Sequence, residues 1–405
     1  MPKVAIIGAG VAGLTAANYL HKAKIAFIVF EASDKPGGKL QTEIVEGFTL
    51  DKGFQVFLTA YPEAKAFLNY KTLKLKHFNS GALIRLQKRF VEVNDPLRQP
   101  GKILSGLTAP IGNLLDKLKI LQLSTSLKRL SIEEIFNTPE QSTFNDLKQL
   151  GFSNKIIERF FKPFLGGIFL ERQLATSNRM FRFVMKMFAE GAAALPSGGI
   201  IKIAEQLAQN LPKEKIEYKK KVNGIEKGKV LFENEDSQSF DYIISSVDFE
   251  KDNTQQYNAV CNLYFAATLP AVKGKKLILN GNGSGLVNNV VFVDEIDPSV
   301  APEGKSLVSV SVIGQPNLSD EKLTKAVQEE LAEWFGMAAK TWKHLKTYRI
   351  EKALPFCAHI NKSITPVENN GIINVGDQFT FGSLNAAMES ARKAAGYVQA
   401  KLNNH

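Results

Sequence analysis

The stretch Val4-Ala-Ile-Ile-Gly8-Ala-Gly10-Val-Ala-Gly13 decides the fold. Its apolar start predicts a buried strand, residues 14–21 predict a helix, and residues 25–30 predict a second strand. A glycine turn between a strand and a helix is the context that the dinucleotide-binding fingerprint requires. There Gly8 permits the tight turn, Gly10 lets the backbone approach a pyrophosphate, and Gly13 allows close packing of helix on strand. The N–H groups that open the helix, at Val11 and Ala12, would face the phosphates.

An acidic residue stands where this fingerprint expects one. Glu31 ends the second strand, 21 residues after Gly10, and is followed by Ala32. A carboxylate there accepts hydrogen bonds from ribose hydroxyls and repels a 2′-phosphate, which argues against NADP. Next come Pro36-Gly37-Gly38-Lys39 and Asp51-Lys-Gly53-Phe54-Gln55. The glycine pair would let the chain pass close to the pyrophosphate and Lys39 would reach a phosphate oxygen, although an ordinary glycine turn with a solvated lysine stays open.

The far end of the chain carries the run Asn374-Val-Gly376-Asp377, followed by Gly382-Ser383-Leu384-Asn385-Ala386. A strand that ends in Gly-Asp can place a carboxylate on a ribityl hydroxyl. The helix that starts near Ser383 would point its positive end at the pyrimidine side of a flavin, which favours the reduced state. An N-capped amphipathic C-terminal helix is the alternative.

Composition narrows the class of protein. The chain has 405 residues, 44% of them hydrophobic and 22% charged, which suits a soluble protein of two or three domains. Lysine and arginine (51) exceed aspartate and glutamate (40) by 11, but no nucleic-acid-binding module is recognised and none is expected. Two distant cysteines and five scattered histidines predict neither a disulfide framework nor a metal site. Since no apolar stretch is long enough to span a membrane and no leader precedes the first strand, we expect a cytoplasmic protein, with peripheral contact to a membrane as an open alternative.

The order of predicted elements indicates an α/β fold. Helices dominate residues 102–190, strands return near 214, and the segments 257–267, 276–280, 287–293 and 306–313 read as a sheet. A helix follows at 320–335, and residues 371–401 read as strand, turn and helix. We therefore predict a Rossmann-like domain assembled from the discontinuous segments 1–75, 195–255 and 350–405. An α+β substrate domain would comprise 76–194 and 256–349. Capping patterns predict helix starts at Ser131 with Glu134, at Thr143 with Asp146, and at Ser177.

These blocks resemble the FAD-dependent amine-oxidoreductase superfamily, which includes flavin amine oxidases, protoporphyrinogen oxidases and phytoene-desaturase-type enzymes. Leu195-Pro196-Ser-Gly198-Gly199 also looks like the family's Pro-x-Gly-Gly segment. The resemblance implies a noncovalently bound FAD and a substrate held between the flavin and the second domain. By this resemblance the cofactor-binding residues are Gly8, Gly10, Val11, Ala12, Gly13, Glu31, Ala32, Gly37, Gly38, Lys39, Gly53, Phe54, Gln55, Val222, Gly376, Asp377, Ser383, Leu384, Asn385 and Ala386.

Three departures from the family's pattern bear on the cofactor and the substrate. Lys39 replaces the arginine common after the glycine pair, and Cys357 lies in Leu-Pro-Phe-Cys rather than in the run that carries a covalent flavin, which favours a core thiol. Between Ala353 and Phe381 there is no tyrosine or tryptophan to cage an amine. Eight phenylalanines concentrate instead in one helical segment, where they form a core or line a cavity for a long lipophilic substrate: Phe152, Phe160, Phe161, Phe164, Phe169, Phe181, Phe183 and Phe188.

The leading hypothesis is an FAD-dependent oxidoreductase that dehydrogenates or desaturates a lipophilic, isoprenoid-like substrate by hydride transfer to flavin N5. No side chain is singled out as catalytic, because the flavin itself accepts the hydride. Protoporphyrinogen-type oxidation and amine oxidation are the alternatives, and a prenyl- or lipid-binding protein on the same scaffold is the non-enzymatic one. The sequence names neither the electron acceptor nor the oligomeric state.

Overall fold

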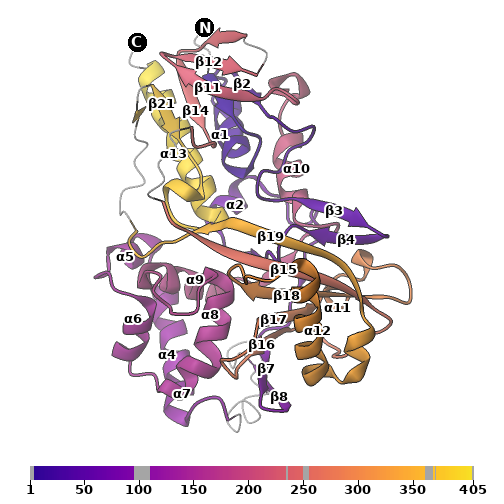
Figure 1. Ribbon diagram of the computed structural model, residues 1–405. Helices are drawn as coiled ribbons and strands as arrows, with labels where there is room; N and C mark the ends of the chain where they lie inside the picture. The colour runs from indigo at the N-terminus through magenta and orange to yellow at the C-terminus, as the bar shows by residue number, and fades with distance from the viewer. Residues whose placement is uncertain are drawn as a thin grey trace.

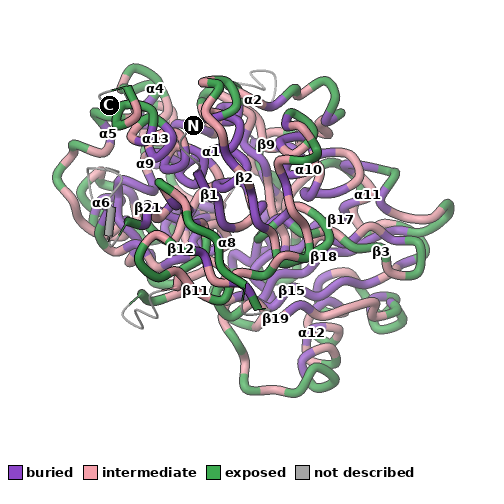
Figure 2. Tube along the Cα trace, turned by 90° about the horizontal axis from the view of Figure 1, so that it is seen from above, coloured by how far each residue is buried: buried purple, intermediate pink, exposed green. Residues whose placement is uncertain are grey.

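A computed structural model describes residues 4–94, 110–233, 236–249, 255–360, 368–369 and 371–403. Its central feature is a six-stranded sheet to which three distant parts of the chain contribute. Five strands run parallel and the last one is antiparallel, in the order β10 (Ile216–Glu217), β2 (Phe27–Phe30), β1 (Val4–Ile7), β14 (Tyr242–Ser245), β21 (Ile372–Asn374) and β20 (Glu368–Asn369). β1 is buried along its whole length, as expected for a central parallel strand (Figure 2).

Helices and a small sheet cover this parallel sheet (Figure 1). α1 (Val11–Lys22) packs against both α13 (Leu384–Asn403) and α10 (Ile201–Gln209). An antiparallel sheet packs on the sheet through Phe30 and Phe232, whose ring centroids are 4.9 Å apart; it consists of β11 (Val222–Glu226), β12 (Lys229–Phe232) and β13 (Ser237–Ser239).

A seven-stranded mixed sheet lies below the first sheet in Figure 1. Its strands follow the order β19 (Lys343–Pro355), β15 (Tyr257–Ala267), β18 (Ser306–Ile313), β17 (Val287–Phe292), β16 (Leu277–Asn280), β7 (Ala82–Leu86) and β8 (Arg89–Val93). Alternate residues of β15, such as Leu263 and Phe265, join the cluster formed with Leu323 and Val327 of α12 (Asp320–Phe335). The alternation confirms the predicted strands and places α12 on one face of this sheet.

A helical layer stands beside the mixed sheet (Figure 1). It consists of α4 (Leu114–Arg129), α5 (Ile132–Asn137), α6 (Thr143–Gln149), α7 (Asn154–Ile156), a π-helical turn at Ile157–Phe161, α8 (Lys162–Phe169) and α9 (Asn178–Glu190). Ser131 and Glu134 form the predicted capping box, and Ser177 caps α9 as predicted. The predicted cap at Thr143 is wrong: Ser142 caps α6, because the Thr143 hydroxyl is buried and donates to the carbonyl of Thr176 at 2.7 Å.

Short elements join these layers. They are the hairpin of β3 (Thr42–Val45) and β4 (Phe48–Asp51), the three-stranded group β5 (Phe57–Leu58), β9 (Ala193–Leu195) and β6 (Lys76–His77), and α2 (Pro62–Phe67). Asp51 ties the hairpin to the start of α10. Its Oδ1 accepts from the Thr42 hydroxyl at 2.6 Å and from the backbone N–H of Ile200 at 2.9 Å.

The predicted α/β class, with a parallel sheet and a second multi-sheet part, is confirmed, whereas the domain boundaries stay a prediction. The first turns of α4 carry three exposed leucines: Leu114, Leu115 and Leu118 are 57%, 63% and 54% exposed. Within the described ranges, no helix combines the length and the apolar character needed to cross a membrane.

Candidate functional site

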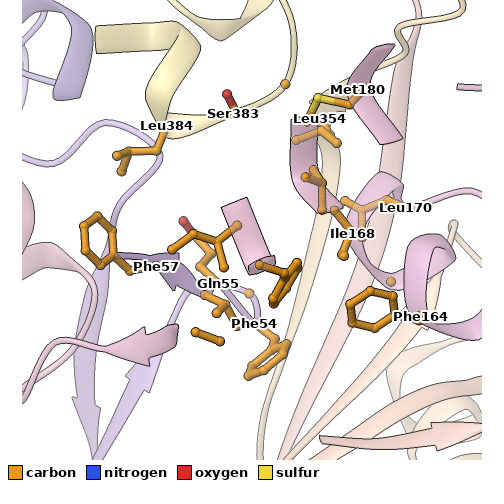
Figure 3. Close-up of a pocket in the computed structure, with 18 of the residues that line it drawn as sticks. Phe54, Gln55, Phe57, Phe164, Ile168, Leu170, Met180, Leu354, Ser383 and Leu384 are labelled. Carbon is orange, nitrogen blue, oxygen red and sulfur yellow. The ribbon is translucent and has the colours of Figure 1, made fainter. Parts of the chain in front are cut away.

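A cavity of about 1400 Å³ lies between the parallel sheet and the second part of the molecule. Its volume exceeds the ~300–1,000 Å³ typical of a pocket for one drug-sized ligand. Figure 3 shows Phe57, Ser383 and Leu384 on one side of the cavity, facing Phe164, Ile168 and Leu170 on the other. The wall combines the turn of residues 8–12 and Glu31 with apolar residues of the helical layer, and we call these two parts the first half and the apolar half of the cavity.

The N-terminus of α1 opens into the first half. Gly10 is the residue before α1 and offers no side-chain cap, and the first turn contains no acidic residue. The first intrahelical hydrogen bond joins the N–H of Leu14 to the carbonyl of Gly10 at 2.9 Å, so the earlier N–H groups are left to other acceptors. Since Val11 and Ala12 line the cavity, these groups form a site for an anion.

The glycines of the turn serve different needs. A Cβ on Gly13 would lie 2.0 Å from the carbonyl oxygen of Gly8, so packing of helix on strand demands glycine there, as predicted. At Gly10 the backbone is ordinary (φ −79°), and a Cβ would meet only the Cα of Gly38, at 3.6 Å. Nothing in the described protein requires glycine at position 10. The space beside it is therefore left open for something that the cavity holds.

Glu31 is fixed at the end of β2. Its Oε2 accepts from the N–H of Ala9 at 2.6 Å, and its Oε1 accepts from the N–H and the hydroxyl of Ser33, both at 2.8 Å. These bonds orient the carboxylate, and Glu31 lines the cavity. The position suits acceptance of hydroxyl hydrogen bonds from a ribose.

Lys39 and Asp377 meet across 338 positions of the sequence. The Lys39 ammonium lies 2.8 and 3.0 Å from the two carboxylate oxygens of Asp377, and both residues line the cavity. The pair is partly open to solvent, since the side chain of Lys39 is 48% exposed. This ion pair brings the Gly37-Gly38 loop next to the C-terminal motif. The sequence predicts that Lys39 and Asp377 contact different parts of the cofactor.

The C-terminal helix also reaches the cavity. Ser383 precedes α13 and accepts from the N–H of Ala386 at 3.0 Å, while Leu384 and Ala387 line the wall. Asn385 faces away: its side-chain oxygen accepts from the backbone N–H of Glu63 at 3.2 Å and holds α2 to α13.

Most of the predicted cofactor residues line this single cavity: Gly8, Gly10, Val11, Ala12, Glu31, Gly37, Gly38, Lys39, Gly53, Phe54, Gln55, Gly376, Asp377, Ser383 and Leu384. Five lie outside its wall: Gly13, Ala32, Val222, Asn385 and Ala386. Gly13 serves packing, Ala32 is exposed, Val222 belongs to the small sheet and packs toward the parallel sheet, and Asn385 and Ala386 are buried. Cys357 is likewise outside the wall, and its thiol contacts the Pro355 carbonyl at 3.4 Å while burial raises its pKa.

The second half of the cavity is apolar. Phe160, Phe164 and Phe188 line it, whereas the other five phenylalanines of the helical segment are buried in the core: Phe152, Phe161, Phe169, Phe181 and Phe183. Helical residues of α4, α8 and α9 and strand residues of β16 and β19 complete the wall, among them Leu121, Ile168, Met180, Val184, Leu279 and Leu354. Such a wall buries mainly apolar surface of a substrate, and Lys117 and Lys128 of α4 add two basic groups to it.

Sequence reasoning missed several residues of the wall. Tyr61 and Tyr257 both line the cavity, and the Lys352 ammonium lies 5.4 Å from the centre of the Tyr257 ring. Burial raises the pKa of Tyr257, and the nearby carboxylates of Asp248 and Asp377 add to the shift. No motif marks these positions; only the pairing of β15 with β19 brings Tyr257 and Lys352 together.

The residues present fit a dinucleotide cofactor. Four features border one cavity: the N–H groups at the start of α1, the open space beside Gly10, the oriented carboxylate of Glu31, and the Lys39 ammonium. The order of the first three along the chain matches the dinucleotide-binding fingerprint. The remaining, apolar half leaves room for a second ligand.

Comparison with known proteins agrees with this geometry. The family model described as "Flavin containing amine oxidoreductase" matches residues 11–399. Protoporphyrinogen oxidase 2, chloroplastic/mitochondrial, of Arabidopsis thaliana is 28% identical over 166 residues, which are 41% of this chain and 32% of that protein. Coproporphyrinogen III oxidase of Mycobacterium leprae (strain TN) is 27% identical over 213 residues, which are 51% of this chain and 44% of that protein. The chain thus matches less than half the length of these relatives.

Solved structures share the fold over nearly the whole chain. An oxidoreductase from Methanosarcina mazei has a TM-score of 0.72 at 20% identity and covers 98% of this chain and 100% of its own. A putrescine oxidase variant has a TM-score of 0.73 at 16% identity, with 99% of both chains covered. At such identities the likeness shows the fold alone.

Proposed function

The chain belongs to the flavin containing amine oxidoreductase family, and from this premise we propose that it is an FAD-dependent oxidoreductase that dehydrogenates a large lipophilic, isoprenoid-like substrate. When bound, FAD supplies the acceptor for a pair of electrons. The observation that carries the proposal is the continuity of one cavity from the α1 N-terminus to the phenylalanine-lined wall.

The chain's own residues have distinct tasks in this proposal. The N–H groups of Val11 and Ala12 hold the pyrophosphate, the Glu31 carboxylate accepts hydrogen bonds from the ribose, and Lys39 neutralises negative charge. The wall that includes Phe160 and Phe164 binds the apolar substrate and excludes water. Dehydrogenation releases a proton as well as a hydride, so a base of the cavity wall or a water molecule must accept that proton; the wall's other contributions are orientation of the substrate and exclusion of bulk water.

Porphyrinogen oxidation is the second candidate. The names of the curated relatives favour it, and a cavity of about 1400 Å³ has room for a large ring beside a cofactor. Amine oxidation is less well supported. Across the cavity from Ser383 and Leu384, Figure 3 labels Phe164, Ile168, Leu170, Met180 and Leu354, none of which offers a hydroxyl or a charged group to an amine.

The test is anaerobic reduction of the bound flavin, followed by its visible absorption. The purified, FAD-loaded protein is mixed with carotenoid precursors, with porphyrinogens and with amines in parallel. Bleaching by a carotenoid precursor supports the proposal, and bleaching by porphyrinogens alone replaces it with the second candidate. A protein that takes up no FAD would contradict the oxidoreductase function and favour a lipid carrier.

We also propose that the protein obtains such a substrate at a membrane surface, through the N-terminal part of α4. Leu114, Leu115 and Leu118 are exposed there, and Lys119 and Lys128 lie on the same helix. Apolar side chains beside basic ones suit an interface with anionic lipid. Leu118 and Leu121 also line the cavity, so this helix joins the exposed leucines to the apolar wall.

A further inference from the structure

Tyr61 is a deeply placed residue of the cavity wall. It lies directly before α2 and lines the cavity, yet only 7% of its surface is exposed. Phe183 stacks on its ring with centroids 6.1 Å apart and planes 7° apart, and Phe57 packs edge-on at 6.1 Å. Burial raises the pKa of Tyr61, so its hydroxyl is a neutral hydrogen-bond donor.

No hydrogen bond from the Tyr61 hydroxyl is found within the described ranges, unlike those from three other tyrosines that are buried or half-buried. Tyr264 donates to the carbonyl of Asp51 at 3.0 Å, Tyr348 donates to the carboxylate of Glu43, and Tyr70 donates to the carbonyl of Thr59 at 3.2 Å. The Tyr61 hydroxyl is not among the fully buried atoms that lack a partner, so it opens into the cavity, where solvent or a bound molecule accepts its hydrogen bond. Phenylalanine would fill this aromatic site equally well. When a ligand displaces solvent from the cavity, the hydroxyl needs an acceptor on that ligand.

The surroundings of Tyr61 show which part of the cavity this is. The N–H of Glu63, two residues later, donates to Asn385 in the first turn of α13 at 3.2 Å. Phe183, which stacks on Tyr61, also contacts Phe381 at 5.5 Å, just ahead of α13. Both links hold Tyr61 beside the N-terminus of α13.

We propose that the Tyr61 hydroxyl donates a hydrogen bond to the pyrimidine edge of the flavin. This inference rests on the proposed function, in which the N-terminus of α13 faces that edge. The edge carries carbonyl oxygens and a ring nitrogen that accept hydrogen bonds, whereas the dimethylbenzene end and a hydrocarbon substrate carry no comparable acceptor. Reduction adds electron density at this edge, so a donor there binds the reduced flavin more tightly than the oxidised one.

The test compares Tyr61→Phe with wild type and with the matched control Tyr70→Phe. Tyr61→Phe keeps both ring contacts, and thermal melting checks that it folds. We expect Tyr61→Phe to bind FAD roughly 3- to 10-fold more weakly, as for the loss of one hydrogen bond. We also expect its midpoint potential to fall by about 30 mV, which is a tenfold weaker preference for the reduced state in a two-electron couple. In the infrared spectrum, a flavin carbonyl band should move to higher frequency in Tyr61→Phe alone, because the Tyr70 hydroxyl already has a protein partner.

The outcomes separate this inference from the proposed function. If a folded Tyr61→Phe variant has the FAD affinity, the potential and the carbonyl bands of wild type, the inference is overturned while the flavoprotein assignment stands. A change confined to the KM of the substrate also overturns it, because the hydroxyl would then serve the substrate. A wild-type protein that takes up no FAD overturns both.

Discussion

Replacement of Gly10 by alanine separates the needs of the fold from those of the cofactor. The described protein tolerates the added methyl group, since a Cβ at this position meets only the Cα of Gly38 at 3.6 Å and φ is −79°. Alanine is a poorer residue than glycine at a helix N-cap, but it also restricts the unfolded chain, so the net change in the free energy of unfolding should stay within about 1 kcal/mol. A bound pyrophosphate, however, would have to retreat from the N–H groups of α1. Loss of two charge-assisted hydrogen bonds costs about 3–6 kcal/mol, which is roughly a 10²- to 10⁴-fold weaker affinity for FAD.

The assay uses protein freed of FAD, its thermal melting, and titration with FAD followed by calorimetry. Gly13→Ala is the matched control, because its Cβ would lie 2.0 Å from the Gly8 carbonyl oxygen and α1 would be displaced. We expect Gly13→Ala to melt well below wild type even without FAD, and Gly10→Ala to melt close to it. An FAD affinity of Gly10→Ala within threefold of wild type would refute the reasoning. So would equal destabilisation of the two FAD-free variants.

The remaining predictions concern charge and surface. Burial raises the pKa of Asp51 to about 6, from an ordinary 3.8, so its protonated form favours the fold and the stability it contributes is lost as the pH rises through 6. Asp51→Asn should therefore gain stability relative to wild type between pH 4 and 7, by up to ~3 kcal/mol, and a difference in melting temperature that does not change with pH would contradict this. Glu31→Gln should keep the bond from Ala9 but weaken FAD binding by about 1–3 kcal/mol, as measured by titration; wild-type affinity would mean that the carboxylate only fixes the turn. The wild-type protein should co-sediment with anionic but not with neutral vesicles, and less of it should co-sediment at high salt. A variant with serine in place of Leu114, Leu115 and Leu118 should co-sediment with neither kind of vesicle. If the wild-type protein itself co-sediments with neither kind, the membrane proposal is contradicted.

Local sequence patterns predict most of the helices and strands of the fold. The helix predicted at residues 320–335 and the strand predicted at 257–267 have these bounds in the structure, because each has a clear period and clear ends. Thr143 shows the limit of this reasoning. Its spacing to Asp146 suits a capping box, but its contact with the Thr176 carbonyl takes the hydroxyl away, and only tertiary structure creates that contact.

The residues of the candidate site also fall into those that local spacing predicts and those that only tertiary contacts bring together. The glycine turn and Glu31 lie within one βαβ unit, so their spacing already predicts their geometry. The pairing of Lys39 with Asp377 and the place of Tyr61 beside α13 depend on contacts across more than 300 residues. Spacing in the sequence says nothing about contacts between residues so far apart, and no local motif marks Tyr61.

The assembly of the parallel sheet from three distant parts of the chain has a consequence for synthesis. β1 leaves the ribosome long before its neighbour β14, which starts at residue 242, and β21 and α13 follow only after residue 371. At ~5–20 residues per second, the roughly 370 residues from β1 to β21 take about 20–75 s to make. Through that time the apolar strand β1 has no completed sheet to enter, and a nascent chain in this state is open to aggregation and to chaperones. FAD can stabilise the protein only once α13 is in place, so supply of the cofactor should affect the yield of folded protein only after this segment has been made.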